Sequence, residues 1–159
     1  MFWVSLNWSL DYLNMYYFDE SFNGKNKAAW LLILEHYISN SDYVEFNQLF
    51  DYDDNYAELL TLESDLVGKN IKEDKLYNFN SVRYNLSENV VKFILSKNYK
   101  DWYNYIYEDI SFRKANREIF GTITHHNYIV AEMSEKEREL FNMSGFNFAQ
   151  IWGEQIDNE

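Results

Sequence analysis

The sequence predicts an α+β fold in which helices dominate and a small antiparallel sheet is the minor part. Several stretches place apolar residues three and four positions apart, which is typical of amphipathic helices. The runs 119–124 and 128–133 are instead rich in β-branched residues and are separated by a short polar turn, which favours a β-hairpin. We expect one globular domain over residues 1–159, because this length is that of an ordinary domain. A wholly helical fold is the alternative.

The first third of the chain is expected to combine a strand with helices. Residues 2–8 fit a loose strand, and residues 9–18 fit either a helix or a second strand. Residues 27–39 are the strongest predicted helix, because they include strong helix formers and are apolar on most sides, as in a helix of the core. A short helix is expected over residues 42–50, with Ser41 as its N-cap.

The middle of the chain is predicted to be mostly helical. Residues 56–67 fit a helix that ends at Gly68. Residues 76–84 fit an extended segment, and Ser87 is a good N-cap for a helix that continues to Ile94. Residues 99–110 carry aromatic and branched side chains at spacings of three and four, which predicts a further helix.

The last part of the chain begins with the predicted hairpin, whose turn is formed by His125, His126 and Asn127. Ser134 and Glu137 have the spacing of a capping box, so we expect a short helix that begins there and continues to Asn142. Residues 146–156 form an amphipathic piece for which a helix is favoured over a strand.

Negative charge is concentrated in the first part of the chain. The formal net charge is −12, and residues 1–68 hold 12 acidic and two basic residues, a balance of −10. Residues 69–159 hold 14 acidic and 12 basic residues and are nearly balanced, at −2. Clustered charge of one sign steers association with a partner of the opposite sign and disfavours nucleic acid. We therefore expect a basic protein partner and no direct binding of nucleic acid, with a merely solvated acidic surface as the alternative.

The segment 51–55 and its neighbours interleave carboxylates with tyrosines. Tyrosine is enriched at interface hot spots, and carboxylates accept paired hydrogen bonds from arginine. The same segment offers oxygen ligands at alternating positions, as calcium loops do, but it lacks the central glycine and distal glutamate of such loops. We therefore interpret it as part of a protein interface. The expected partner-binding residues are Asp42, Glu45, Asp51, Tyr52, Asp53, Asp54, Tyr56 and Glu58.

Most common enzyme signatures are absent from the sequence. The five glycines do not space into a phosphate-binding or dinucleotide-binding loop, and neither G-x-S-x-G nor H-E-x-x-H occurs. The absence of cysteine excludes disulfides, thiolate nucleophiles and zinc sites built on sulfur. We expect no cofactor, no metal and no catalytic residue.

The adjacent histidines His125 and His126 are the main local cue for acid–base or metal chemistry. Neighbouring side chains of a strand point to opposite faces, whereas those of a turn can converge. If the two histidines converge, Glu118 or Glu132 is the candidate carboxylate to complete a site. His36 lies among apolar neighbours on the predicted central helix, so we expect it to be a structural histidine.

Size, charge and composition together resemble those of bacterial immunity proteins, although no motif supports the resemblance. We expect a non-enzymatic acidic inhibitor that binds and neutralises a basic toxin or nuclease. One alternative is a counter-defence protein of a phage or mobile element, such as an anti-CRISPR, an anti-restriction protein or a DNA mimic. The other is a small hydrolase or metal-dependent enzyme that uses His125 and His126. We expect a cytoplasmic protein, because no positive charge precedes Lys25 and no apolar run is long enough to span a membrane.

Overall fold

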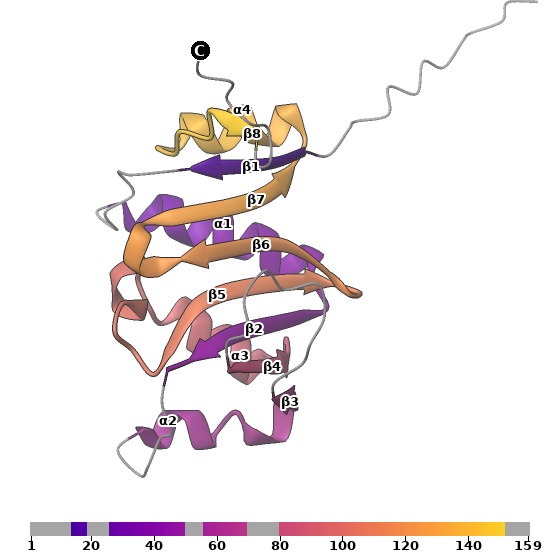
Figure 1. Ribbon diagram of the computed structural model, residues 1–159, viewed down its shortest axis with the longest axis vertical. Coiled ribbons are helices and arrows are strands. Elements are labelled where there is room, and N and C mark those ends of the chain that lie inside the picture. Colours follow the sequence, from indigo (N-terminus) through magenta and orange to yellow (C-terminus); the bar gives the residue numbers. More distant parts are fainter. Residues whose placement is uncertain (1–13, 19–25, 50–55, 70–79, 152–159) are drawn as a thin grey trace, which may run out of the picture.

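A computed structural model describes residues 14–18, 26–49, 56–69 and 80–151 (Figure 1). These residues form an eight-stranded sheet in the order β3-β4-β2-β5-β6-β7-β1-β8, and all neighbouring strands are antiparallel. The strands are β1 (Asn14–Phe18), β2 (Tyr43–Gln48), β3 (Leu66–Lys69), β4 (Ser81–Asn85), β5 (Tyr107–Lys114), β6 (Arg117–Ile123), β7 (Tyr128–Met133) and β8 (Gln150–Ile151). Both the acidic first part and the balanced second part of the chain therefore supply strands to one sheet.

The helices are short and lie beside and at the ends of the sheet (Figure 1). They are α1 (Lys27–Asn40), α2 (Ala57–Leu60), α3 (Glu88–Leu95) and α4 (Glu135–Met143), with 3-10 turns η2 (Glu63–Asp65), η3 (Tyr99–Trp102) and η4 (Thr124–His126). Figure 1 shows α1 and α3 on the same side of the sheet, with α2 and α4 at its opposite ends. No helix in the described ranges is long and apolar enough to cross a membrane.

The prediction that helices dominate the fold is wrong, as is the wholly helical alternative, because the large sheet is the main element. Two predicted helices account for most of the error. Residues 42–50 contain strand β2, and residues 99–110 contain the short turn η3 and the start of β5. Both strands are buried on both faces, so their sequences lack the alternation of apolar and polar residues that marks a half-buried strand.

Several local predictions are confirmed. The helix predicted over residues 27–39 is α1, and the Asn26 side chain caps it by accepting a hydrogen bond from the Ala29 amide. Ser87 caps α3, and the capping box of Ser134 and Glu137 begins α4 with both of its hydrogen bonds present. The hairpin predicted on either side of His125 is formed by β6 and β7.

Other segments differ in part from the predictions. Residues 56–67 form only the single turn of α2 and the 3-10 turn η2 before β3 begins at Leu66. The strand alternative holds for residues 14–18, and part of the predicted last helix is strand β8. The strand predicted over residues 2–8 lies outside the described residues.

The core lies between the sheet and the two helices on its inner side. Trp30 and Tyr37 of α1 and Phe93 of α3 are buried against aromatic side chains of the sheet such as Phe46 and Phe120. Side-chain hydrogen bonds also link α1 to its surroundings. The Trp30 indole donates to the backbone oxygen of Lys97 at 3.2 Å, and the Tyr37 hydroxyl donates to that of Glu132 at 2.7 Å.

The opposite face of the central strands is charged instead of apolar. Cross-strand pairing places Arg83 of β4 opposite Glu45 of β2, which in turn lies opposite Ser111 of β5. The Arg83 Nε donates to Glu45 Oε2 at 3.0 Å, and Arg113 Nη1 lies 3.6 Å from Glu45 Oε1. All three charged side chains are almost completely buried. Glu118 extends this network, since its Oε2 lies 3.8 Å from Arg113 Nη1.

Candidate functional site

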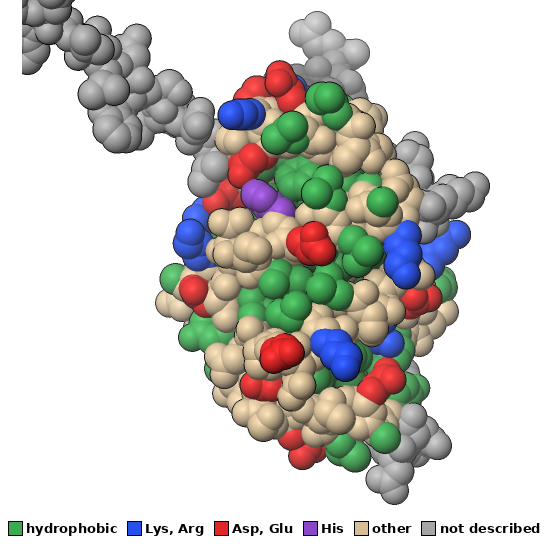
Figure 2. All heavy atoms as spheres, turned by 180° about the vertical axis from the view of Figure 1, so that it is seen from behind, with side chains coloured by type: hydrophobic (Ala, Val, Ile, Leu, Met, Phe, Trp, Pro, Cys, Tyr) green, Lys and Arg blue, Asp and Glu red, His purple; other side chains and the backbone are tan. Residues whose placement is uncertain are grey.

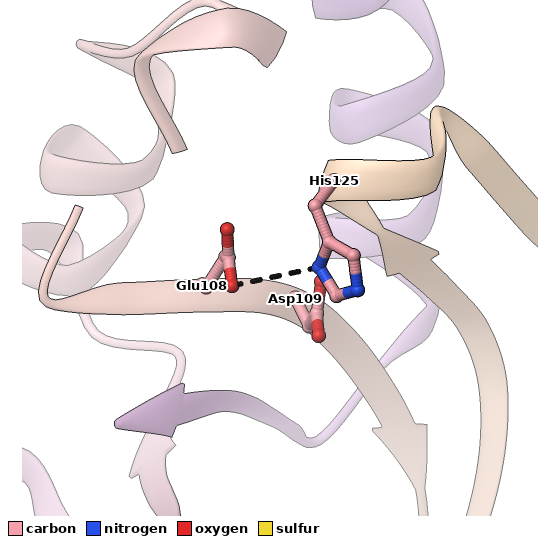
Figure 3. Close-up of side chains that lie close together, drawn as sticks. All are labelled: Glu108, Asp109 and His125. Carbon is pink, nitrogen blue, oxygen red and sulfur yellow. Dashed lines mark ion pairs between the residues drawn. The ribbon is translucent and has the colours of Figure 1, made fainter. Parts of the chain in front are cut away.

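Two consecutive carboxylates, Glu108 and Asp109, lie at an irregularity in strand β5. The register with β2 changes here, because Asn47 pairs with Glu108 while Glu45 pairs with Ser111. Asp109 has φ 51°, in the left-handed region that aspartate tolerates better than most residues. Consecutive side chains of a regular strand point to opposite faces, whereas a bulge redirects one of them. Here both carboxylates approach His125 of η4 (Figure 3).

Backbone amides hold both carboxylates in place. The amide of Asn104 donates to Glu108 Oε1 at 3.3 Å, and the amide of Thr124 donates to Asp109 Oδ1 at 2.7 Å. His125 Nδ1 lies 3.8 Å from Glu108 Oε2. One potential ligand atom from each of Glu108, Asp109 and His125 lies within 4.8 Å of the others. We name these three residues the carboxylate–histidine cluster.

The carboxylate–histidine cluster is negatively charged and partly buried. The Glu108 side chain is 6% exposed, whereas that of His125 is 46% exposed. Among the described residues, no lysine or arginine forms an ion pair with Glu108 or Asp109. Burial, and then the charges of Asp109 and Glu108, raise the pKa of the nearby Tyr99 above its usual range. The Tyr99 hydroxyl is therefore protonated at neutral pH beside two carboxylates.

His126 does not belong to this cluster. Its ring stacks on that of Tyr128, with centroids 5.7 Å apart. The carboxylates that the sequence suggested for a histidine site are also used elsewhere, since Glu118 accepts a hydrogen bond from Ser111 and Glu132 pairs with Arg117. The structure thus brings one of the two predicted histidines to a carboxylate pair that was not predicted.

His36 is half-buried on α1, as expected for a structural histidine. Its ring packs edge-on against those of Tyr37 and Phe141, with centroids 4.8 and 5.3 Å apart. Its Nε2 lies 3.5 Å from Glu137 Oε1 at the start of α4. These contacts join α1 to α4.

The predicted partner-binding residues do not form one patch among the described residues. Asp51, Tyr52, Asp53 and Asp54 lie outside the described ranges. Glu45 is 1% exposed and pairs with two arginines, so it cannot contribute to an acidic surface. Asp42 is exposed, and its Oδ2 accepts the Ala115 amide at 2.7 Å in the turn between β5 and β6.

Tyr56 and Glu58 of the predicted interface lie together at α2. The rings of Tyr56 and Tyr105 meet edge-on, and the Tyr105 hydroxyl donates to Glu58. Lys97 Nζ lies 3.4 Å from Glu58 Oε1. The hydrogen bond from Tyr105 and the charge of Lys97 lower the pKa of Glu58, against the opposing effect of partial burial. Glu58 is therefore ionised at neutral pH and already has a basic neighbour.

A surface that sequence reasoning missed lies next to these residues. Leu60, Leu66 and Val67, which lie within the helix predicted over residues 56–67, are 47%, 38% and 44% exposed. We name the segment 56–69, together with the N-terminus of α3, the β3 end. Its acidic side chains are Glu58, Glu63, Asp65 and Glu88. At the lower edge of Figure 2, acidic and apolar side chains lie next to each other.

Comparisons of the chain with protein-family models, curated proteins and solved structures find no match. The two candidate sites therefore have to be interpreted from their own chemistry. One is an exposed surface of acidic and aliphatic side chains at the β3 end. The other is the carboxylate–histidine cluster, where two oxygen donors meet one nitrogen donor.

Proposed function

We propose that the protein is a non-enzymatic inhibitor of the immunity type, which binds and neutralises a basic protein such as a toxin or nuclease. The observation that carries this proposal is the β3 end. Exposed aliphatic side chains lie among carboxylates there, at strand β3, which is an edge strand of the sheet among the described residues. Exposed apolar residues that are surrounded by polar ones are more common at protein interaction sites than on the rest of a protein surface. We further propose that the protein acts in the cytoplasm of the producing cell.

The apolar residues give the β3 end its anchors. Of the large hydrophobic residues that are exposed among the described ones, Leu60, Leu66 and Val67 fall within this part of the chain. Burial of such side chains on binding supplies most of the affinity, at about 25 cal/mol per Å² of apolar surface before the costs of association. Carboxylates around these anchors select a basic partner and increase its association rate.

Strand β3 offers a backbone template as well. It pairs with β4 on one side and has no further strand beyond it among the described residues. An extended segment of a partner can pair with such an edge and add a strand to the sheet. The short length of β3 and the register shift between Leu66 and Gly68 limit unspecific pairing with other copies of the chain.

The distribution of charge favours an inhibitor over a DNA mimic. A mimic needs carboxylates spaced along an extended surface, as phosphates are along DNA. On the helix side of the molecule, acidic side chains are scattered among basic and apolar ones (Figure 2). Glu45 points into a buried ion-pair network instead of outward. The acids of the β3 end instead fit a compact interface with one basic protein.

The experiment compares three double variants for capture of a basic partner from lysate of the source cells, followed by calorimetric titration with the purified partner. The acidic variant is Glu63→Gln with Asp65→Asn, and the apolar variant is Leu60→Ser with Val67→Ser. The control is Glu35→Gln with Glu139→Gln, which removes the same charge from exposed positions on α1 and α4.

We expect the control to bind as the native protein does and both β3-end variants to bind at least about tenfold more weakly, since each mutant pair removes about 1.4 kcal/mol or more. The native protein should also abolish the partner's toxicity on co-expression. Equal binding by all variants contradicts an interface at the β3 end. Failure to retain any basic protein contradicts the inhibitor function itself.

A further inference from the structure

We propose that Glu108, Asp109 and His125 bind one divalent transition-metal ion, of which zinc is the best match. The carboxylate–histidine cluster provides two oxygen ligands and one imidazole nitrogen, and zinc binds this mixture of donors in proteins. Three ligands from the protein leave a fourth position for water or for a donor from a bound molecule. The proposal is independent of the inhibitor function, because the β3 end contributes no residue to it.

The distances in the cluster fit a metal ion. Zinc bonds to nitrogen and carboxylate oxygen are about 2.0–2.2 Å long, so two ligands of a tetrahedral site lie about 3.4 Å apart. His125 Nδ1 and Glu108 Oε2 lie 3.8 Å apart, which is beyond a hydrogen bond but close to this separation. The exposed His125 side chain can shorten this distance by a small rotation, and the three potential ligand atoms all lie within 4.8 Å of one another.

The environment of the carboxylates also fits a metal ion. A buried carboxylate is stable only if it is paired with a positive charge or neutralised. Glu108 is 4% exposed and has Asp109 as its neighbour, yet no arginine or lysine pairs with either among the described residues. Two adjacent carboxylates without a lysine or arginine partner in the described part of the chain are an imbalance of charge in this place. A divalent cation removes that imbalance.

Hydrogen bonds from backbone amides orient the two carboxylates, as is common around metal sites. The amides of Asn104 and Thr124 fix one oxygen of each carboxylate and leave the second oxygen of each able to coordinate. The bulge at Asp109 costs backbone free energy, since a left-handed conformation is unfavourable for a residue with a side chain. Its result is that one oxygen of each of the two adjacent carboxylates lies within 4.8 Å of a ring nitrogen of His125 (Figure 3).

The test is calorimetric titration of the chelator-treated full chain with zinc chloride, repeated with manganese chloride. The variants are His125→Ala, Glu108→Gln and Asp109→Asn, and the matched control is His126→Ala. The control removes an exposed histidine at the adjacent position, whose ring centroid lies 4.5 Å from that of His125, so it separates coordination by His125 from unspecific binding to surface imidazole. Circular dichroism checks the fold of each variant. His125→Ala is the decisive variant, because its side chain is largely exposed.

We expect one zinc ion per chain, binding that is at least about tenfold weaker in each of the three cluster variants, and unchanged binding in His126→Ala. Substitution with cobalt should give the visible absorption of a four-coordinate ion with nitrogen and oxygen ligands. The absence of stoichiometric binding to the native chain overturns the proposal. An equal loss in His125→Ala and His126→Ala does so too.

Discussion

Glu45 and Glu108 are buried glutamates on neighbouring strands of the same sheet, and they have opposite surroundings. Glu45 is 1% exposed and lies between Arg83 and Arg113. Glu108 is 4% exposed and faces Asp109 and His125. The negative charge of Glu45 is balanced by two arginines of the fold. No lysine or arginine of the described residues balances that of Glu108. Burial alone therefore does not distinguish a structural carboxylate from one that can bind a ligand, but the countercharge does.

The largest expected effect on stability comes from disrupting the ion pairs around Glu45. Arg113→Ala leaves Glu45 with one of its two arginines and removes one partner of Glu118, so we expect a loss of about 3–5 kcal/mol in the free energy of unfolding. Urea denaturation measures it. The matched control is Arg117→Ala, whose exposed ion pair with Glu132 should contribute under about 1 kcal/mol. Similar losses in both variants would mean that the buried network is not the stronger one.

The Glu108 side should respond in the opposite direction. Glu108→Gln keeps an oxygen for the Asn104 amide and removes an unbalanced charge, so the metal-free variant should be as stable as the native protein or more stable. With zinc at 100 times its dissociation constant, only the native protein should gain about 2.7 kcal/mol. Thermal denaturation with chelator and with zinc measures both terms. A destabilised metal-free variant would show that Glu108 is a structural carboxylate like Glu45.

The smallest expected effect concerns Glu58. This glutamate has a basic partner, as Glu45 does, but it is exposed. Its pKa is lower in the folded protein than in the unfolded chain, so its stabilising contribution is present above the unfolded pKa and is lost as the pH falls through the folded pKa. The side chain is 53% exposed, and solvent screening limits this contribution to under about 1 kcal/mol. Glu58→Gln should therefore reduce the loss of stability between pH 7 and pH 3 slightly. An unchanged pH profile contradicts this.

Local signals in the sequence predicted the parts of the fold that local interactions determine. The capping box at Ser134, the N-cap at Ser87 and the apolar helix that begins at Lys27 all depend on residues within a turn or two of each other. The hairpin around His125 is local in the same sense. Strand β2 depends instead on partners far along the chain, and β5 pairs with β2 as well as with its neighbour β6. Their doubly buried sequences fit a helix equally well until those partners are known.

The carboxylate–histidine cluster was half predictable for the same reason. The sequence indicated His125 because it adjoins His126, but His126 lies outside the cluster. Glu108 and Asp109 fell within a predicted helix and were not singled out. Their convergence depends on a bulge at Asp109, and no glycine marks that bulge in the sequence. A pair of adjacent acids in a strand carries no sign of which side each will face.

The order of the strands has a consequence for the path by which the chain folds. Strands β5, β6 and β7 follow one another in chain order, so each closes only a short loop to its neighbour. In contrast, Asn14 pairs with Met133 and Tyr43 pairs with Arg113, so these strand pairs join residues far apart in the sequence. Local pairings form faster than distant ones, so the three-stranded meander is the natural nucleus and β1 and β2 join it later. Because the cluster spans β5 and the turn between β6 and β7, a metal ion that binds there would accelerate refolding, whereas a partner bound at β3 would mainly slow unfolding.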